Sequence, residues 1–283
     1  MKDIRVFYYD TQANFGDQLN VRLLRDLFNL KPVHTPIDRA DLICIGSVLH
    51  SLLRTIGRAS KLWQRLSHSR LHVWGSGFVA NYVVPAEPGH APKHFYRRLE
   101  LHALRGELTK QQVQTLTGRP AARAVLGDPG LLCSELIARP GKTRNKVGIV
   151  PHYRHVRNPR VTELSQTVRS CRVIDVTAPP MEFLVQLSSC GVVISSALHG
   201  LIAADSLGIP NRRLVLSDQT MGGDYKFEDY YSVFTADDHR PLCLPDGAKV
   251  PSERQILDGM WLAERGEVDA VKNRLYDSFP FKS

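Results

Sequence analysis

Apolar residues along the chain alternate between short runs rich in β-branched and aromatic residues and longer stretches in which leucines recur at helical spacing. In the first half the runs that predict strands are 4–9, 41–46, 71–74 and 124–126. Helical periodicity is found at 18–30 and at 107–116. Alternation of strands and helices in this order predicts an α/β fold with a mostly parallel sheet.

The same rhythm restarts after a polar stretch, 138–145, which is typical of a linker. Strands are expected at 146–151, 171–176, 191–195 and 213–216, and helices at 160–169, 180–189 and 197–207. The amphipathic tail 252–276 is predicted to be helical. We therefore predict two Rossmann-like domains, 1–140 and 141–250, that face each other across a cleft, with 251–283 forming a C-terminal helix that packs back on them.

Composition is that of an ordinary globular protein, with 43% hydrophobic and 23% charged residues. No apolar run approaches the ~20 residues needed to span a bilayer. The first residues read as a strand and not as a signal peptide, so a cytoplasmic location is expected. The five cysteines include no CxxC pair, which favours reduced thiols over a disulfide framework.

A net charge of +9 favours an acidic partner, such as nucleic acid, anionic lipid or a phosphorylated substrate. The basic residues are dispersed, and no RNP-type aromatic strand, zinc-finger spacing or heptad-linked basic region accompanies them. We therefore predict no nucleic-acid partner. No clustered carboxylates and no His/Cys ligand set are apparent along the sequence, so neither a metal nor a cofactor is expected.

Unusual residues follow the predicted strands of the first half, at the edge where parallel sheets bind ligands. Glycines at such positions let the backbone approach a ligand, and a helix N-terminus offers N–H groups to an anion. An aspartate there is explained equally well as a helix cap or turn acceptor, and an arginine as a surface ion pair. The candidates are Asn14, Gly16, Asp17, Gly75, Ser76, Gly77, Arg105 and Asp128.

In the second half the strongest feature is the strand that ends at Ser195 and Ser196, followed directly by His199. The serines are expected to cap the next helix, and with its N–H groups they form an anion cradle. An imidazole there is poised to act as a general acid or base, although a satisfied core histidine is the alternative. His152 and Arg154 follow another strand, and Lys226 lies in what reads as a glycine-containing surface loop.

Six blocks in order along residues 1–235 resemble the polysaccharide pyruvyl transferase family, in particular its short bacterial exopolysaccharide enzymes of the xanthan and succinoglycan kind. The tail after Phe234 carries no part of this resemblance. The blocks are Asn14-Phe15-Gly16-Asp17, Gly46-Ser47-Val48-Leu49-His50, Trp74-Gly75-Ser76-Gly77, Leu104-Arg105-Gly106, Gly127-Asp128-Pro129-Gly130-Leu131-Leu132 and Ser195-Ser196-Ala197-Leu198-His199-Gly200.

This resemblance implies a fold similar to GT-B glycosyltransferases. It also implies transfer of a pyruvyl group from phosphoenolpyruvate to two hydroxyls of one sugar, which gives a cyclic ketal and phosphate. His199 is then expected to supply a proton, and fixed cations must neutralise the donor's charges. Arg105, His152, Arg154 and Lys226 are the candidate cations, with Arg105 grouped with His199 as catalytic.

Two other functions stay open on the sequence. A nucleotide-sugar-dependent GT-B glycosyltransferase would need an acidic ribose ligand late in the second domain, for which Glu228 or Asp229 qualifies. A non-catalytic glycan- or polyanion-binding module is the third interpretation. Because family acceptors are often lipid-linked oligosaccharides, the net charge of +9 further predicts peripheral association with anionic membranes at the cytoplasmic face of the inner membrane.

Overall fold

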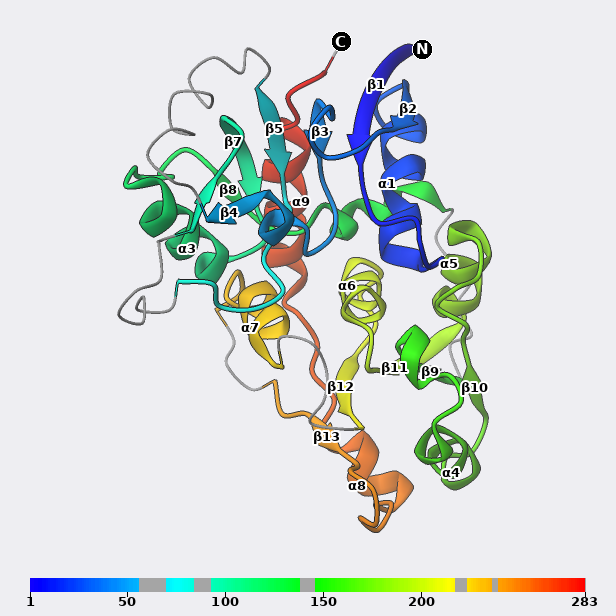
Figure 1. The fold of residues 1–283 in the computed structure, drawn as a ribbon. Helices are drawn as coiled ribbons and strands as arrows, with labels where there is room; N and C mark the ends of the chain where they lie inside the picture. Colours follow the sequence, from blue (N-terminus) through cyan, green and yellow to red (C-terminus); the bar gives the residue numbers. More distant parts are fainter. Residues whose placement is uncertain (56–69, 84–92, 138–145, 217–222, 236–238, 283) are drawn as a thin grey trace, which may run out of the picture.

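Two parallel β-sheets organise the chain in a computed structural model that describes residues 1–55, 70–83, 93–137, 146–216, 223–235 and 239–282 (Figure 1). The first sheet has six strands and the second has five, and a two-stranded antiparallel pair lies beside them. The predicted α/β fold class is confirmed. The predicted linker 138–145 lies outside the described residues.

The first sheet has the strand order β2-β1-β3-β5-β7-β8. Every pair in it is parallel. Its strands are β1 (Lys2–Phe7), β2 (Leu30–His34), β3 (Leu42–Ile43), β5 (Leu71–Trp74), β7 (Leu99–Leu104) and β8 (Val125–Leu126). The antiparallel pair consists of β4 (Leu53–Thr55) and β6 (Lys93–Phe95). Parallel pairing brings the carboxyl ends of the six strands to one edge, where the loops that follow them meet.

Helical segments connect these strands. They are α1 (Phe15–Asp26), η1 (Leu49–Leu52), α3 (Glu107–Thr117) and η2 (Pro129–Leu136). The N-terminal end of α1 is fixed by Asn14, whose side chain accepts a hydrogen bond from the Asp17 N–H, so the helix begins earlier than its leucine periodicity indicates. Buried leucines of α1 pack on the sheet within the larger core of the molecule.

The second sheet has the order β10-β9-β11-β12-β13, again with parallel pairs throughout. Its strands are β9 (Lys146–Val150), β10 (Cys171–Val173), β11 (Cys190–Ser195), β12 (Asn211–Val215) and β13 (Leu242–Cys243). The helical segments of this half are η3 (Tyr153–His155), α4 (Pro159–Thr167), α5 (Pro180–Ser188), α6 (Leu198–Ser206) and α7 (Tyr225–Tyr231).

The C-terminal tail forms two helices, α8 (Glu253–Leu257) and α9 (Arg265–Asp277), where one long helix is predicted. Between them Trp261 forms a β-bridge with Asn211, which interrupts the helix. The longer helix, α9, returns to the first sheet (Figure 1), where the Trp74 indole Nε1 donates to the Leu275 carbonyl at 3.0 Å. Phe279 stacks on Phe28 with ring centroids 3.8 Å apart, so the tail completes the core of the first half.

Five strands of the described residues, β2, β4, β6, β7 and β13, were absent from the sequence prediction. The edge strand β2 contains Pro32, and proline is tolerated in a sheet only where its missing N–H costs no ladder bond, as at an edge. The strand β7 carries Glu100 and His102 among its apolar residues, which weakens its hydrophobic signal. Conversely, the segment around Lys226, predicted as a surface loop, forms helix α7.

Candidate functional site

A cavity of about 480 Å³ opens where the carboxyl ends of strands from both sheets meet. Residues after β1, β3, β9 and β11 form its wall, together with the first turns of α1 and α6 and with Lys226 of α7. Seven of the predicted site residues line it: Asn14, Gly16, Asp17, His152, Arg154, His199 and Lys226. Seven others lie outside the lining: Gly75, Ser76, Gly77, Arg105, Asp128, Ser195 and Ser196.

The first turn of α1 forms one wall. Asn14 caps this helix through the N–H of Asp17 at 3.0 Å, and its amide also donates to the Asp17 carboxylate. Burial raises the pKa of Asp17, against the opposing effects of the Asn14 hydrogen bond and of His199. The sequence left open whether Asp17 is a cap or a ligand residue, and the structure places its side chain next to the cap, on the cavity wall.

His199 lies against α1 at the N-terminal end of α6. A methyl group added to Gly16 would fall 2.0 Å from His199 Nδ1, so only glycine permits this approach. On its other side, His199 Nε2 lies 3.7 Å from Asp128 Oδ2. Neither of these two atoms has a hydrogen-bond partner among the described residues. The imidazole is thus held between a helix N-terminus and a carboxylate that is fully buried.

The two serines before His199 do not cap α6, contrary to the prediction, because their hydroxyls are taken by the backbone around the end of β9. The N-cap residue is Ala197, which has no side-chain cap. Ser195 Oγ donates to the Val150 carbonyl at 3.0 Å, and Ser196 Oγ accepts from the His152 N–H at 2.8 Å. The serines therefore tie β11 to β9. Of the groups that were predicted to bind an anion here, only the backbone N–H groups at the start of α6 are left for that role.

Basic side chains from the loop after β9 and from α7 also line the cavity. Burial, followed by the charges of Arg105, Arg213 and Arg154, lowers the pKa of Lys226 to about 8. Burial, followed by Lys226, His155 and Arg154, lowers the pKa of His152 to about 3. Among the described residues, no carboxylate lies within ion-pair distance of Lys226 or Arg154. Lys226 is partly buried and Arg154 is exposed at the cavity mouth, and positive charge that lines a cavity without a counter-ion indicates a site for an anion.

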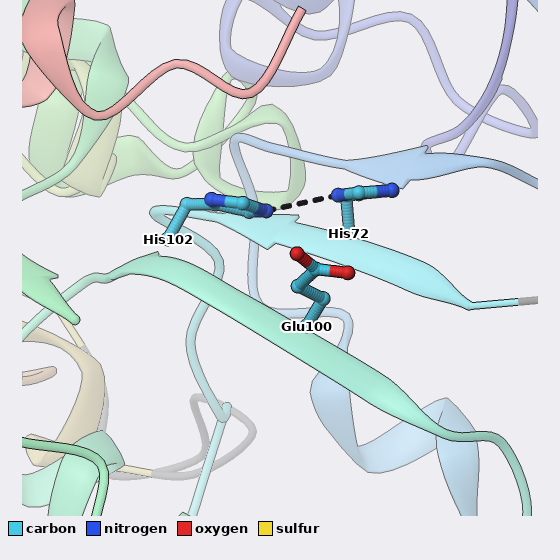
Figure 2. Close-up of side chains that lie close together, drawn as sticks. All are labelled: His72, Glu100 and His102. Carbon is cyan, nitrogen blue, oxygen red and sulfur yellow. Dashed lines mark hydrogen bonds between the residues drawn. The ribbon is translucent and has the colours of Figure 1, made fainter. Parts of the chain in front are cut away.

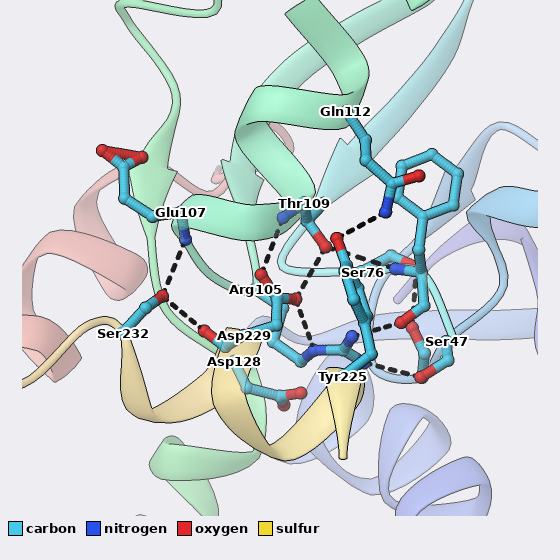
Figure 3. A network of polar contacts seen from close by, with 12 residues as sticks. Ser47, Ser76, Arg105, Glu107, Thr109, Gln112, Asp128, Tyr225, Asp229 and Ser232 are labelled. Atoms are coloured by element: carbon cyan, nitrogen blue, oxygen red, sulfur yellow. Dashed lines mark hydrogen bonds and ion pairs between the residues drawn. The ribbon is translucent and has the colours of Figure 1, made fainter. Parts of the chain in front are cut away.

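Arg105 does not line this cavity, and its side chain is 1% exposed and pairs with Asp229 of α7 at 2.9 Å (Figure 3). Its Nη1 donates to Ser47 Oγ at 2.6 Å, and Ser47 is a lining residue. Its Nη2 donates to the Phe78 carbonyl. The guanidinium thus supports the cavity wall from behind.

The partner Asp229 has no free carboxylate oxygen. Besides Arg105, it accepts from the Thr109 N–H at 2.7 Å and from the Thr109 hydroxyl at 2.6 Å. Glycines make this packing possible, since a methyl group on Gly106 would fall 1.6 Å from the Asp229 carbonyl oxygen, and one on Gly77 would fall 2.4 Å from Arg105 Cζ. The strand-end residues Gly77 and Arg105, together with Gly106, therefore form a buried clasp between β7, α3 and α7.

The remaining predicted residues hold loops in place. Ser76 Oγ donates to the Gly46 carbonyl at 2.8 Å, so the Gly75–Gly77 turn supports the wall at Gly46. Asp128 Oδ1 accepts from the Gly130 N–H at 2.8 Å, which is the turn-acceptor role that the sequence allowed, while its other oxygen faces His199.

A family model described as polysaccharide pyruvyl transferase matches residues 14–217, which is well over half of the chain. The chain belongs to this family. The resemblance of the six sequence blocks to the family as a whole is thereby confirmed, and membership gives the protein a pyruvyltransferase role in polysaccharide biosynthesis. The match begins at the α1 cap, Asn14, and includes the cavity residues of both sheets up to His199.

Two further comparisons accompany the family match. An uncharacterized protein of Acanthamoeba polyphaga mimivirus is 26% identical over 254 residues, which cover 86% of this chain and 79% of that protein. The solved structure of a functionally uncharacterized protein from Klebsiella pneumoniae covers 85% of this chain and 92% of its own, with a TM-score of 0.44 and 13% identity.

Several residues that line the cavity were not among the sequence candidates. Tyr9, Thr11 and Gln12 follow β1 and precede the helix whose first turn supplied the sequence candidates. His50 belongs to one of the six family blocks and was not predicted as a site residue, yet it lines the cavity and stacks on Tyr82 with ring planes 3° apart. Ligands of parallel sheets bind beyond the carboxyl ends of the strands, and this rule predicts all of these positions when every residue of the loop is considered and not only its glycines and charged residues.

Proposed function

We propose that this pyruvyltransferase takes its pyruvyl group from phosphoenolpyruvate and forms a cyclic ketal on two hydroxyls of one sugar in an exopolysaccharide repeat unit. The observation that carries the proposal is the pairing of unneutralised basic side chains with a buried His199–Asp128 couple across one cavity. Phosphoenolpyruvate needs both features, because it is a small polyanion whose reaction begins with a proton transfer.

The reaction requires one proton on the methylene carbon of the donor. The first sugar hydroxyl then bonds to the central carbon, the bond from that carbon to the phosphate oxygen breaks, and the second hydroxyl closes the ketal. One hydroxyl proton ends on the new methyl group and the other on the released phosphate. His199 is placed to carry such a proton, because its ring lines the cavity at the start of α6 with the Asp128 carboxylate 3.7 Å behind Nε2.

The basic wall neutralises the donor. Lys226 and Arg154 bring charge from α7 and from the loop after β9, while the N–H groups at the start of α1 and α6 add the positive ends of two helix dipoles. With a pKa of about 3, His152 is a neutral hydrogen-bonding group at physiological pH, so we assign it orientation of the donor and not charge compensation.

The glycosyltransferase alternative loses one of its two acidic residues. Asp229 is 0% exposed and both of its carboxylate oxygens already accept hydrogen bonds from Arg105 or Thr109, so it is not available to a ribose in the cavity. Only Glu228 remains for that role, and it is absent from the cavity wall.

A donor-binding experiment tests the proposal without knowledge of the acceptor. Phosphoenolpyruvate is expected to raise the melting temperature of the protein with a saturable concentration dependence, and UDP-sugars are not. With an oligosaccharide acceptor present, phosphate release should follow phosphoenolpyruvate consumption one to one. Stabilisation by UDP-sugars alone would favour the glycosyltransferase, and binding of glycan without phosphate release would favour a passive module.

We also propose that the acceptor is a lipid-linked oligosaccharide and that the protein meets it at an anionic membrane surface. No helix among the described residues is long and apolar enough to cross a membrane. A groove of about 670 Å³ along the start of β7 and the end of α3 is lined by four arginines, of which Arg98, Arg119 and Arg123 are exposed. None of these three pairs with a carboxylate of the described residues.

A further inference from the structure

Two histidines and a glutamate meet on the first sheet (Figure 2). His72 comes from β5, and Glu100 and His102 come from β7. One ligand atom from each of the three lies within 4.8 Å of the others. His72 Nδ1 and His102 Nε2 are 2.9 Å apart, and the two rings stack at 5.1 Å with planes 17° apart.

Strand pairing explains why these side chains share one face. His72 is the direct partner of Glu100 in the parallel register, and side chains two apart on a strand point to the same side. The register shifts between Val73 and Trp74, whose partners are Leu101 and Ala103, so His102 is the extra residue of a bulge. Bulges redirect a side chain, and this one brings His102 against the ring of His72.

The three groups have the chemistry of a metal site. Neutral imidazole nitrogens and a carboxylate are ligands that Zn²⁺ prefers, at roughly 2.0–2.2 Å from the ion. Two nitrogens bound to one ion at that distance can be no more than ~4.2 Å apart. The two histidine nitrogens are 2.9 Å apart, so a small outward movement of the rings makes room for the ion. Burial is the first cause that lowers the pKa of both histidines, which keeps the neutral form that binds metal.

Competition for the carboxylate is weak. Glu100 pairs with Arg70 at 3.2 Å, but the Arg70 side chain is 55% exposed and can turn into solvent at little cost. The site is also partly roofed, because Phe281 of the C-terminal tail packs edge-on against His72 at 4.8 Å. Partial exposure of the three ligands leaves room for a water molecule to complete a four-coordinate shell.

We propose that His72, Glu100 and His102 bind one divalent transition-metal ion of the zinc class, which joins β5 to β7 beside the C-terminal tail. None of the three residues lines the cavity, so the ion has a structural role and is independent of the pyruvyl-transfer proposal. The sequence did not reveal the site, because the two histidines are 30 positions apart and only the sheet register brings them together.

Zinc titration of the untagged, metal-depleted protein tests this site directly. Calorimetry should show one ion bound per chain, and zinc should raise the melting temperature. His102→Gln and Glu100→Gln should each weaken binding by about tenfold or more, as expected when one of three protein ligands is lost. Glu100→Gln keeps the bond between the two histidines, so it separates loss of the metal from loss of the fold.

The matched control is His34→Gln. His34 also lies on a strand of this sheet with a carboxylate nearby, Asp10 at 3.2 Å, but with no second imidazole bonded to it among the described residues. This variant should bind zinc as the wild type does. Failure of the wild type to bind zinc would overturn the proposal. Equal zinc binding by the wild type and all three variants would also overturn it and would indicate adventitious binding to surface histidines only.

Discussion

His199 has two neighbours that give its ring nitrogens different surroundings. Nε2 faces the buried Asp128 at 3.7 Å, and Nδ1 lies where a side chain at position 16 would be. At 3.7 Å this carboxylate is not hydrogen-bonded to Nε2, and closure of the gap on ligand binding would direct Nε2–H toward it and leave Nδ1 to exchange a proton with the ligand. The ring also lines the cavity while being only 16% exposed, so that exchange is shielded from bulk water.

His199→Ala is therefore expected to lower turnover by roughly 10²–10⁴-fold, the usual contribution of general acid–base catalysis. Donor affinity should fall much less, because Lys226, Arg154 and the helix N–H groups still hold the anion. His199→Gln should retain donor binding without restoring the rate. Phosphate release, calorimetric donor affinity and melting temperature are measured on each variant, with His34→Ala as the control.

Near-normal turnover in folded His199→Ala would contradict the catalytic assignment. A parallel loss of activity and of folded fraction would instead identify His199 as a core histidine. Asp128→Asn adds a second check, since it keeps the shape of the turn but removes the charge that faces Nε2.

Lys226 makes a pH-dependent prediction. With a pKa lowered to about 8, its ammonium group loses a proton as the pH rises through 8, whereas Arg154 keeps its charge. Affinity for phosphoenolpyruvate should therefore fall progressively above about pH 8. Lys226→Arg should extend tight binding to higher pH, and Lys226→Met should weaken binding at pH 7 and abolish the dependence. Calorimetry between pH 6.5 and 9.5 measures this, and identical profiles for wild type and Lys226→Arg would refute it.

At the scale of elements, α7 joins the two halves of the molecule through the buried clasp of Arg105, Asp229 and Thr109 (Figure 3). Removal of one partner leaves a buried charge without compensation, which costs about 3–5 kcal/mol. Arg105→Met should lower the free energy of unfolding by that amount and also weaken donor binding, because Ser47 and Lys226 lose their support. Arg105→Lys should retain only part of this stability and donor affinity, because the planar guanidinium with its several N–H donors is lost.

The control for the clasp is Arg265→Met, which breaks an exposed pair with Asp269 and should cost about 0–1 kcal/mol. Urea unfolding measures both variants. Arg105→Met combined with Asp229→Leu should be more stable than Arg105→Met alone, because no unpaired charge remains. Wild-type stability and donor affinity in Arg105→Met would show that the clasp supports neither the fold nor the cavity.

Elements with strong periodicity could be predicted from the sequence, and those defined by long-range pairing could not. The helix expected at 107–116 is Glu107–Thr117, and the strand at 71–74 is Leu71–Trp74. The cavity residues near strand ends could be predicted too, because the parallel sheet fixes where those ends meet. By contrast, the pairing of Arg105 with Asp229 spans 124 positions, and nothing local distinguishes such an arginine from one that binds substrate.

At the scale of the whole molecule, the surplus of nine positive charges predicts a salt-sensitive attraction to anionic membranes. The protein should bind vesicles that contain anionic lipid at low ionic strength, dissociate on addition of salt and ignore neutral vesicles. Co-sedimentation measures all three. Replacement of Arg98, Arg119 and Arg123 by glutamine should reduce binding most, because these arginines are exposed and lack acidic partners among the described residues.

A charge-matched control separates that groove from diffuse attraction. Replacement of Arg5, Arg254 and Arg265 by glutamine removes the same charge at positions already paired with Asp41, Asp258 and Asp269. If the groove is the membrane contact, the control protein should bind vesicles more tightly than the groove variant at equal net charge. Equal loss in both would assign the attraction to overall charge alone, and binding to neutral vesicles as strong as to anionic ones would exclude an electrostatic contact altogether.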